Sequence, residues 1–292
     1  MFATTEMPPS TLIILPCHSI YIRNGKPSKE ALTRPEDDGP GSKEEDWILA
    51  SFQKEARDQH CLLKHLYTSI KLLSKDPSDR LLVISGGYTK PQAQKSESSS
   101  YLEVSRDRNI ASDELEKSIL LEEYARDSYE NVVFSLCAFR QATGIWPKHV
   151  KIVGFEFKRK RFLNYHMHTI QYPAENVEYI GIGPEYPSAE YFGVDDVSYE
   201  ENRKKYFEST FASEHKYAIE PFSKNEFGSF GSVLHEKKEK RDPFDRGGQI
   251  LAHYTIPGEL AMNSLLSLDR LPYGEARSVY EEKCDGKFSW DA

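Results

Sequence analysis

Polar and charged residues follow several apolar runs of this sequence, and their types suit the binding of an anion or the transfer of a proton. They are His18, the turn Ser85-Gly86-Gly87, Glu122 with the nearby Asn131, and the basic pair Lys158 and Arg161. Imidazole and carboxylate groups act as acids and bases, whereas lysine and arginine bind phosphate and carboxylate groups. The sequence therefore predicts a site for a small anionic ligand, provided that the apolar runs are strands ending at one place.

The Ser85-Gly86-Gly87 turn is the centre of this predicted pocket. Glycine lets the backbone turn sharply and approach a phosphate, carboxylate or ribose without a Cβ in the way. Two glycines after a strand also form plain tight turns, and neither G-x-G-x-x-G nor G-x-x-x-x-G-K-[ST] is present. Both interpretations stay open on the residues alone.

The acidic residues from Glu122 onward allow two interpretations. Asp127 and Glu130 fit a capping box, in which Asp127 accepts N–H bonds at a helix start and Glu130 reaches back to the cap. A carboxylate group at such a turn also binds divalent cations or acts as a general base. Because capping accounts for Asp127 and Glu130, Glu122 is the predicted catalytic residue and Asn131 a predicted ligand contact.

Basic residues and histidines complete the candidate set. Lys158 and Arg161 are expected to bind an anion at the mouth of the pocket, although a solvated basic turn is an equal alternative. His18 is expected to contact the same ligand. His166 and His168 lie two residues apart in an expected helix, so they diverge, and no metal site is assigned.

Strand and helix patterns alternate five times between residues 11 and 182. Strands are expected at 11–15, 81–84, 118–122, 150–155 and 177–182, where apolar residues form short runs. Helices are expected at 56–73, from near Ser96, from Ser128 to Gly144, and at 159–170. This alternation predicts an α/β fold: a Rossmann-like three-layer αβα sandwich with a mainly parallel, doubly wound sheet of about five strands.

Two further segments lie outside that alternation. Residues 23–46 are rich in Gly, Pro and charge, which predicts a long loop of the kind that often forms lids. Residues 183–292 are expected to form a C-terminal extension that packs on the core of residues 1–182. In it, 200–211 is compatible with a helix, and the charged run 235–246 is expected to be a solvated surface loop.

Composition narrows the class of protein. The 292 residues are 38% hydrophobic and carry a formal charge of −8, which disfavours nucleic acid and anionic membranes as partners. The four cysteines form no C-x-x-C pair, and the first apolar run ends at Pro16, too early for a membrane span. We therefore expect a cytoplasmic protein with reduced thiols and no membrane partner.

Three ordered motifs resemble those of the YdcF-like family, defined by domain of unknown function 218. The first is the strand into Ser85-Gly86-Gly87 with Ser96 and Glu97 downstream; the second comprises Glu122, Asp127, Ser128, Glu130 and Asn131; the third comprises Val153, Glu156, Phe157 and Arg161. Lys158 stands where the family has histidine, and Pro16-Cys17-His18 replaces its usual glycine. The lysine favours ligand binding over proton transfer at that position.

The resemblance covers residues 11–182 and implies a Rossmann-like fold that binds nucleotide-like ligands. It adds Glu97 and Ser128 to the ligand-binding residues, and S-adenosylmethionine, a nucleotide or a divalent metal to the compatible cofactors. The sequence leaves two functions open: a hydrolase or transferase acting on a phosphorylated or nucleotide-like molecule, and a non-catalytic sensor or scaffold that binds such a molecule.

Overall fold

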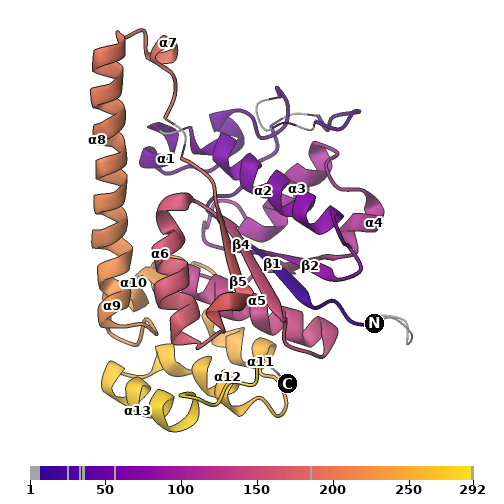
Figure 1. Ribbon diagram of the computed structural model, residues 1–292, viewed down its shortest axis with the longest axis vertical. Helices are drawn as coiled ribbons and strands as arrows, with labels where there is room; N and C mark the ends of the chain where they lie inside the picture. The colour runs from indigo at the N-terminus through magenta and orange to yellow at the C-terminus, as the bar shows by residue number, and fades with distance from the viewer. Residues whose placement is uncertain are drawn as a thin grey trace.

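Five parallel strands form the central sheet, in the order β3-β2-β1-β4-β5 (Figure 1). A computed structural model of the chain describes residues 7–24, 26–32, 34, 37–55, 57–184 and 186–290, without the side chains of Glu55 and Tyr191. The strands are β1 (Thr11–Pro16), β2 (Arg80–Ser85), β3 (Ile119–Glu122), β4 (His149–Gly154) and β5 (Val177–Gly181). Each lies within two residues of its predicted bounds, and the predicted α/β fold is confirmed.

Alternate residues of each strand face opposite layers of helices, as the pleat of a strand requires. Ile13 and Leu15 pack in a hydrophobic cluster with Leu62 of α2 (Asp58–Ser74) and Val104 of α3 (Glu97–Asp107). On the other face, a second cluster contains Leu12 and Ile14, and α5 (Ser128–Thr143) contributes several of its residues. Both faces are covered, which explains why the strands are continuous apolar runs.

Shorter helices connect and extend these layers. The core of residues 1–182 adds η1 (Glu44–Asp46), α1 (Ser51–Glu55), α4 (Asp113–Glu116), η2 (Glu156–Lys158), α6 (Arg159–Arg161), the π-helical turn η3 (Phe162–Met167) and η4 (Ala174–Asn176). Ala56, where the first helix was expected to begin, lies outside the described residues. The expected helix at 159–170 is present as α6 and η3.

The expected helix boundaries are confirmed at three caps. The Ser96 side chain accepts a hydrogen bond from the Ser99 N–H at the start of α3, and Asp127 accepts one from the Glu130 N–H at the start of α5. Gly144 ends α5 with a φ of 81°, a left-handed conformation that glycine adopts without a Cβ clash. The capping box is incomplete, however, because the Glu130 carboxylate accepts from the N–H of Arg126 and not from that of Asp127.

A buried arginine holds the long segment 23–46. The Arg108 side chain is fully buried and donates to the carbonyl oxygens of Arg34, Asp37 and Pro40 at 2.9, 3.1 and 2.8 Å. Its Nε also donates to the Tyr67 hydroxyl at 2.8 Å. These bonds pin the described part of this segment to α2 and α3, so it is an anchored loop here and not an open lid.

The C-terminal extension is helical. Its part from residue 220 onward packs against the α5 side of the sheet, while its long helix at 196–214 stands beside α6 (Figure 1). Its helices are α7 (Ala189–Phe192), α8 (Asp196–Glu214), the π-helical η5 (His215–Ile219), α9 (Glu220–Lys224), α10 (Val233–Lys240), η6 (Gly247–Gln249), α11 (Ile250–Tyr254), α12 (Leu260–Leu265), η7 (Leu268–Arg270) and α13 (Tyr273–Lys283). Phe222, Tyr254, Tyr280 and Trp290 belong to the same hydrophobic cluster as α5. The helix expected at 200–211 is present, and longer, as α8.

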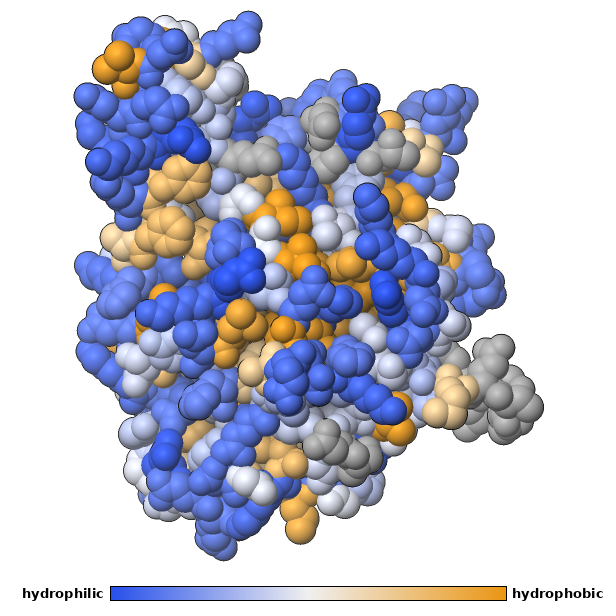
Figure 2. Space-filling model, viewed as in Figure 1, coloured by the Kyte–Doolittle hydropathy of each residue, from blue (hydrophilic) through white to orange (hydrophobic). Residues whose placement is uncertain are grey.

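The edge of the sheet at β5 is only partly covered. Val177 and Ile180 are partly buried, and Figure 2 shows hydrophobic residues gathered in the middle of this face, over β4 and β5, inside a hydrophilic periphery. Within the described ranges, none of the helices has the length and apolar content that crossing a lipid bilayer requires.

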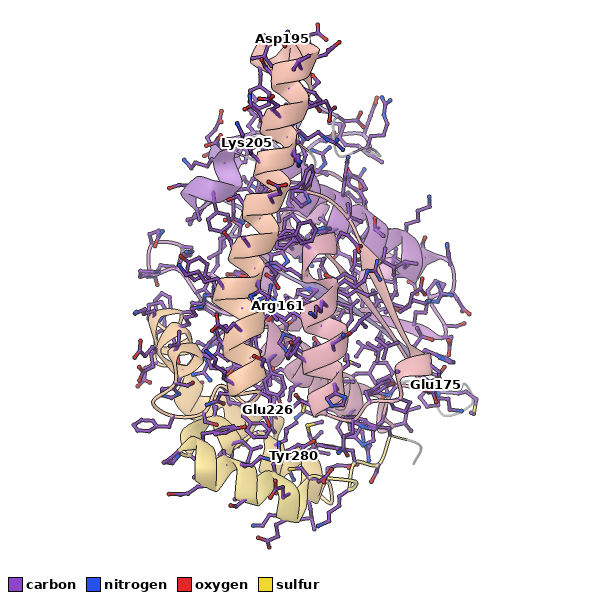
Figure 3. All side chains as sticks on the ribbon, turned by 60° about the vertical axis from the view of Figure 1, so that its left-hand side comes forward. Arg161, Glu175, Asp195, Lys205, Glu226 and Tyr280 are labelled. Atoms are coloured by element: carbon purple, nitrogen blue, oxygen red, sulfur yellow. The ribbon has the colours of Figure 1, made fainter. Side chains whose placement is uncertain are left out.

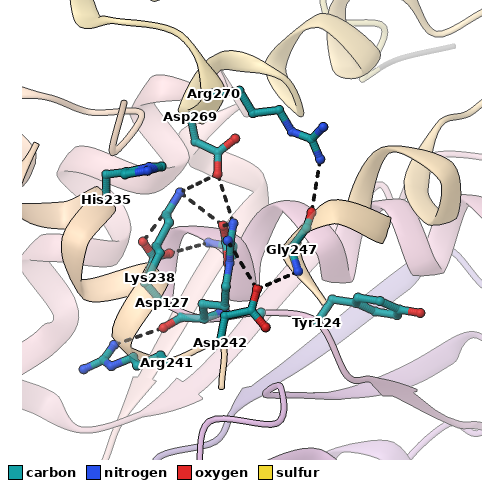
Figure 4. A network of polar contacts seen from close by, with 12 residues as sticks. Tyr124, Asp127, His235, Lys238, Arg241, Asp242, Gly247, Asp269 and Arg270 are labelled. Carbon is teal, nitrogen blue, oxygen red and sulfur yellow. Dashed lines mark hydrogen bonds and ion pairs between the residues drawn. The ribbon is translucent and has the colours of Figure 1, made fainter. Parts of the chain in front are cut away.

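The charged run 235–246 is not the solvated loop that its composition suggests. Residues 233–240 form α10, and Lys238 is only 1% exposed. Its Nζ lies 3.1 Å from Glu130 Oε1, 3.5 Å from Asp269 Oδ2 and 3.9 Å from Asp127 Oδ2 (Figure 4). The prediction is wrong because a single residue of the run turns inward, and the carboxylates that neutralise it come from distant parts of the chain.

Arg126 shares those carboxylates. Its guanidinium binds Glu130 with two hydrogen bonds, at 3.0 and 2.6 Å, and Asp269 at 2.9 Å. The two neighbouring cations hold the pKa of Glu130 down to about 2 despite the burial that opposes this shift. The network therefore attaches the C-terminal extension to the start of α5.

We predict that Lys238→Met lowers the free energy of unfolding by about 3–5 kcal/mol, because it leaves buried carboxylates without one of their two cations. Urea unfolding followed by circular dichroism measures the change. Lys240→Met on the same helix is the matched control, since Lys240 is exposed and surface substitutions stay within about 0.5 kcal/mol. Equal effects of the two substitutions would contradict the structural role of Lys238.

Candidate functional site

Most of the predicted site residues lie at the same end of the sheet, where the carboxyl ends of its strands meet. β1 leads into His18, β2 into Gly86, and β4 into Lys158, and β1 lies between β2 and β4. The chain order of the strands reverses between β1 and β4, and ligands of open α/β sheets bind at such switch points. His18 and Lys158 flank this position directly.

Glu122 occupies a different environment from the one expected of a catalytic base. It is fully buried, and its two oxygens accept four hydrogen bonds: from the Ser85 hydroxyl at 2.5 Å, the N–H groups of Tyr124 and Ala125 at 2.6 and 3.0 Å, and the Tyr254 hydroxyl at 2.9 Å. Burial raises the pKa of Glu122 to about 7. These contacts account for Glu122 without a reaction, and its catalytic role stays a prediction.

The neighbours of Glu122 are equally occupied. The Asn131 amide donates to the Ser85 carbonyl oxygen at 3.0 Å and to its hydroxyl at 2.8 Å. Ser85 and Asn131 are both buried. Ser85, Glu122 and Asn131 thus form one internal cluster that ties the ends of β2 and β3 to α5.

The two glycines of the predicted pocket serve close packing. The Gly86 N–H donates to the Glu122 carbonyl at 3.0 Å and the Gly87 N–H to the Ala125 carbonyl at 2.8 Å. A Cβ on Gly86 would lie 2.8 Å from Glu97 Cβ, and one on Gly87 would lie 2.8 Å from the Ala125 oxygen. Close packing therefore requires glycine at both positions, and both N–H groups already have backbone acceptors. A ligand contact at this turn stays a prediction.

His18 and Lys158 form the pair that marks the switch point. Lys158 Nζ lies 3.2 Å from His18 Nδ1 and 5.1 Å from the centre of the Phe155 ring. Burial, and then the charge of Lys158, lowers the pKa of His18 well below its usual value, so the imidazole is neutral and Lys158 donates to it. Burial, and then the charge of Arg161, lowers the pKa of Lys158 to about 7.

Two carboxylates also lie in the electrostatic neighbourhood of Lys158. Glu97, predicted from the resemblance, accepts a hydrogen bond from the Thr89 hydroxyl, and burial raises its pKa. Asp58 is 6% exposed at the start of α2, and burial raises its pKa to about 7 against the opposing charge of Lys158. Sequence reasoning missed Asp58; an aspartate opening the helix after the long loop was the available signal.

Arg161 is engaged by the C-terminal extension. Its Nη2 donates to Glu214 Oε2 at 3.0 Å, and its Nε lies 2.9 Å from Glu214 Oε1. Figure 3 shows Arg161 between α8 and the helix formed by α6 and η3. The side chains are 12% and 6% exposed, so the predicted anion-binding arginine already holds a carboxylate of the same chain.

Ser128 and the remaining basic residues complete the surroundings. The Ser128 hydroxyl lies 2.8 Å from His166 Nε2. Arg241, an exposed residue just after α10, lowers the pKa of His18, Lys158, Arg161 and Lys237 through its charge, although it is not the main cause at any of them. Among the residues that the structure describes, no group of three His, Cys, Asp or Glu side chains could hold a metal ion.

Perturbed pKa values gathered at one place are typical of functional sites. Lys158 and Asp58 are both shifted to about 7, and a shift of this kind costs stability that a ligand of suitable charge restores. The arrangement can bind an anion at Lys158 and can donate or accept a proton near neutral pH.

Comparison with known proteins gives the chain one relative. The uncharacterized protein YOR238W of Saccharomyces cerevisiae is 30% identical to it over 272 residues, which cover 80% of this chain and 84% of the yeast protein. The chain belongs to the YOR238W family. No family model matches the chain, and no solved structure does.

The likeness to YOR238W extends beyond the α/β core. Residues 1–182 make up less than two thirds of the chain, whereas the match covers 80% of it. Part of the C-terminal extension therefore belongs to what the YOR238W family shares.

We predict that Glu122→Gln keeps the fold, because the Gln oxygen accepts the three bonds made to Oε1 and its NH2 group donates to the Ser85 hydroxyl. The folded-state pKa of about 7 lies above the ordinary value of 4.5, so the favourable contribution of wild-type Glu122 exists below pH 4.5 and is lost as the pH rises through 7. Between pH 4.5 and 8, the free energy of unfolding of the variant should therefore rise relative to that of the wild type by on the order of 3 kcal/mol.

Glu122→Ala is the contrasting variant. It leaves four buried donors unpaired and opens a cavity, which should cost about 3–5 kcal/mol at any pH. Guanidinium unfolding curves at pH 5 and pH 8 measure both variants. A Glu122→Gln protein that loses as much stability as Glu122→Ala at pH 8 would refute this account of the cluster.

Proposed function

We propose that this protein binds a small, anionic, phosphate-bearing or nucleotide-like molecule at the switch point between the carboxyl ends of β1 and β4. The observation that carries the proposal is Lys158. It lies at the switch point, is largely desolvated and contacts a neutral imidazole. Within the described residues no carboxylate lies within 4 Å of its Nζ, so its charge is available to a ligand.

The charges around Lys158 are of both signs. Glu214 and Asp58 favour its protonation, whereas Arg161, which has the largest of these effects, and Arg241 repel the protonated lysine. A phosphate group bound there would relieve this repulsion and favour the charged lysine. The neutral His18 ring beside it, whose buried Nε2 has no hydrogen-bond partner among the described residues, supplies a further contact for a phosphate or ribose hydroxyl.

The resemblance to the YdcF-like family supports a nucleotide-like ligand, including S-adenosylmethionine. Its motif positions Glu97, Lys158 and Arg161 belong to this crevice, whereas Ser85, Glu122 and Asn131 belong to the internal cluster beneath it. We place the ligand on the first group and regard the second as its support.

A catalytic role as a hydrolase or transferase is the second candidate. It is favoured by Asp58 and Lys158, whose pKa values near 7 suit proton transfer at neutral pH. The competing sensor or scaffold function predicts binding without turnover. Incubation of the best ligand with the protein, followed by mass spectrometry of the products, separates the two.

A thermal-shift panel tests the proposal. Inorganic phosphate, nucleoside mono- and diphosphates, sugar phosphates and S-adenosylmethionine are compared, each with and without Mg²⁺. A ligand at a hundredfold excess over Kd should stabilise the protein by about 2.7 kcal/mol. If Lys158→Met and Arg161→Met each bind the best ligand as tightly as the wild type, the crevice is not its site.

We predict that anion affinity depends on pH through Lys158. Because the pKa of the free lysine is lowered to about 7, the affinity of a phosphate ligand that needs the charged lysine should fall about tenfold for each pH unit above 7. Lys158→Arg keeps its charge at all these pH values and should abolish the dependence. Isothermal titration calorimetry at pH 6, 7, 8 and 9 measures it, and a wild-type affinity that stays constant would exclude Lys158 as the anion contact.

Glu214 provides a second prediction for the same site. Glu214→Gln removes the carboxylate that neutralises Arg161 and leaves that guanidinium free to bind a ligand anion. We expect an affinity for inorganic phosphate about tenfold higher, equal to about 1.4 kcal/mol. Glu208→Gln on the exposed face of α8 is the control, and a decrease in affinity in Glu214→Gln would contradict the prediction.

A further inference from the structure

A serine and a histidine from different helices meet beside the proposed anion crevice. The Ser128 hydroxyl lies 2.8 Å from His166 Nε2, which is the distance expected between a nucleophile and its general base. Ser128 is partly exposed, whereas His166 is 1% exposed. The pair therefore combines an accessible oxygen with a protected base.

His166 reaches Ser128 because of a local irregularity in the helix. It lies in the π-helical turn η3, which begins directly after Arg161. In a π turn the hydrogen bonds join residues five apart, and such turns often occur at functional sites. His166 follows Arg161 by five residues, so the turn brings both to the same side of the helix.

The surroundings keep His166 neutral. Burial, followed by the charges of Arg161 and Lys238, lowers its pKa well below the usual value. Phe162 and Phe222 contact its ring edge-on, with ring centres 5.3 and 4.5 Å away. The neutral imidazole can accept the hydroxyl proton at Nε2, and the lowered pKa makes it a weaker base than an ordinary histidine. Its buried Nδ1 has no hydrogen-bond partner among the described residues.

The position of Ser128 favours an oxyanion. It is the first residue of α5, a helix of 16 residues, and the positive end of a helix dipole stabilises negative charge that develops near its first turn.

We propose that Ser128 is a nucleophile with His166 as its general base, and that the pair cleaves esters of carboxylic acids that carry an anionic group. Ser128 Oγ would bond to the ester carbonyl carbon while its proton moves to His166 Nε2. The bond from that carbon to the alcohol oxygen then breaks, and the alcohol leaves with the proton from His166. Water hydrolyses the acyl-serine with the same base and releases the carboxylate.

This inference rests on the proposed function only for the charge of the substrate. The nucleophile itself is tested with an uncharged alkyl fluorophosphonate, which needs no anion site. Ser128 Oγ forms a bond to phosphorus, the P–F bond breaks, fluoride leaves with the electron pair, and the proton moves to His166.

The experiment is labelling of the full-length protein with this probe, followed by intact-mass measurement and peptide mapping. We expect one adduct per chain, on Ser128, and none in Ser128→Ala. His166→Gln keeps a hydrogen-bond acceptor for the Ser128 hydroxyl but removes the base, so labelling should slow by about a hundredfold or more. Ser135→Ala, a buried serine of the same helix, should react like the wild type.

A further readout separates this role from simple packing. Because His166 is neutral over the whole range, the labelling rate should stay flat between pH 6 and 9. Absence of an adduct on wild-type Ser128, or labelling of His166→Gln at the wild-type rate, would overturn the inference. If His166→Gln does not fold, the mapped adduct and its pH profile in the wild-type protein decide the question.

Discussion

The buried carboxylate of Glu122 is the interaction on which the arrangement of this molecule depends. It accepts hydrogen bonds from the end of β2, from the turn after β3 and from Tyr254 in the C-terminal extension. Burying a carboxylate away from water costs free energy unless hydrogen bonds occupy its lone pairs. The constraint therefore runs both ways: the four donors stabilise the carboxylate, and the carboxylate fixes their relative positions.

A second buried network extends this attachment to the remaining helices. Lys238 of α10 meets Glu130 of α5 and Asp269 of η7 in the interior, while Arg126 joins the same carboxylates from the turn before α5. Moving either cation away would leave buried carboxylates without compensation. The extension is therefore firmly attached to the rest of the molecule. The extension also places Glu214 beside Arg161, so the proposed anion site contains groups from both parts of the chain.

The crevice differs from its supporting clusters in how its charges are balanced. In the clusters beneath it, each buried charge has partners that hold it in its ionic or protonated form. At the switch point, Lys158 contacts the neutral His18 ring and the Phe155 ring, and its pKa falls to about 7. This imbalance, more than the glycine turn that first marked the region, is what supports the proposed ligand site.

Local patterns in the sequence determined the strands, the caps and the edge of the sheet where the candidate residues lie. Apolar runs of four to six residues predict buried strands, and Ser96, Asp127 and Gly144 predict helix ends, since each of these signals acts within a few residues of itself. The two glycines at 86 and 87 mark this turn in the sequence, and close packing requires them.

Only the tertiary structure decided which charges are buried and with whom. Lys238 and Glu130 are 108 positions apart, Arg161 and Glu214 are 53 apart, and Ser128 and His166 are 38 apart. No local pattern distinguishes Lys238 from its exposed neighbours, because its burial depends on where α10 packs. The polar contacts of the candidate site form between elements that are far apart in the chain. Packing decides which residues become partners, and local patterns of residue types do not encode that packing.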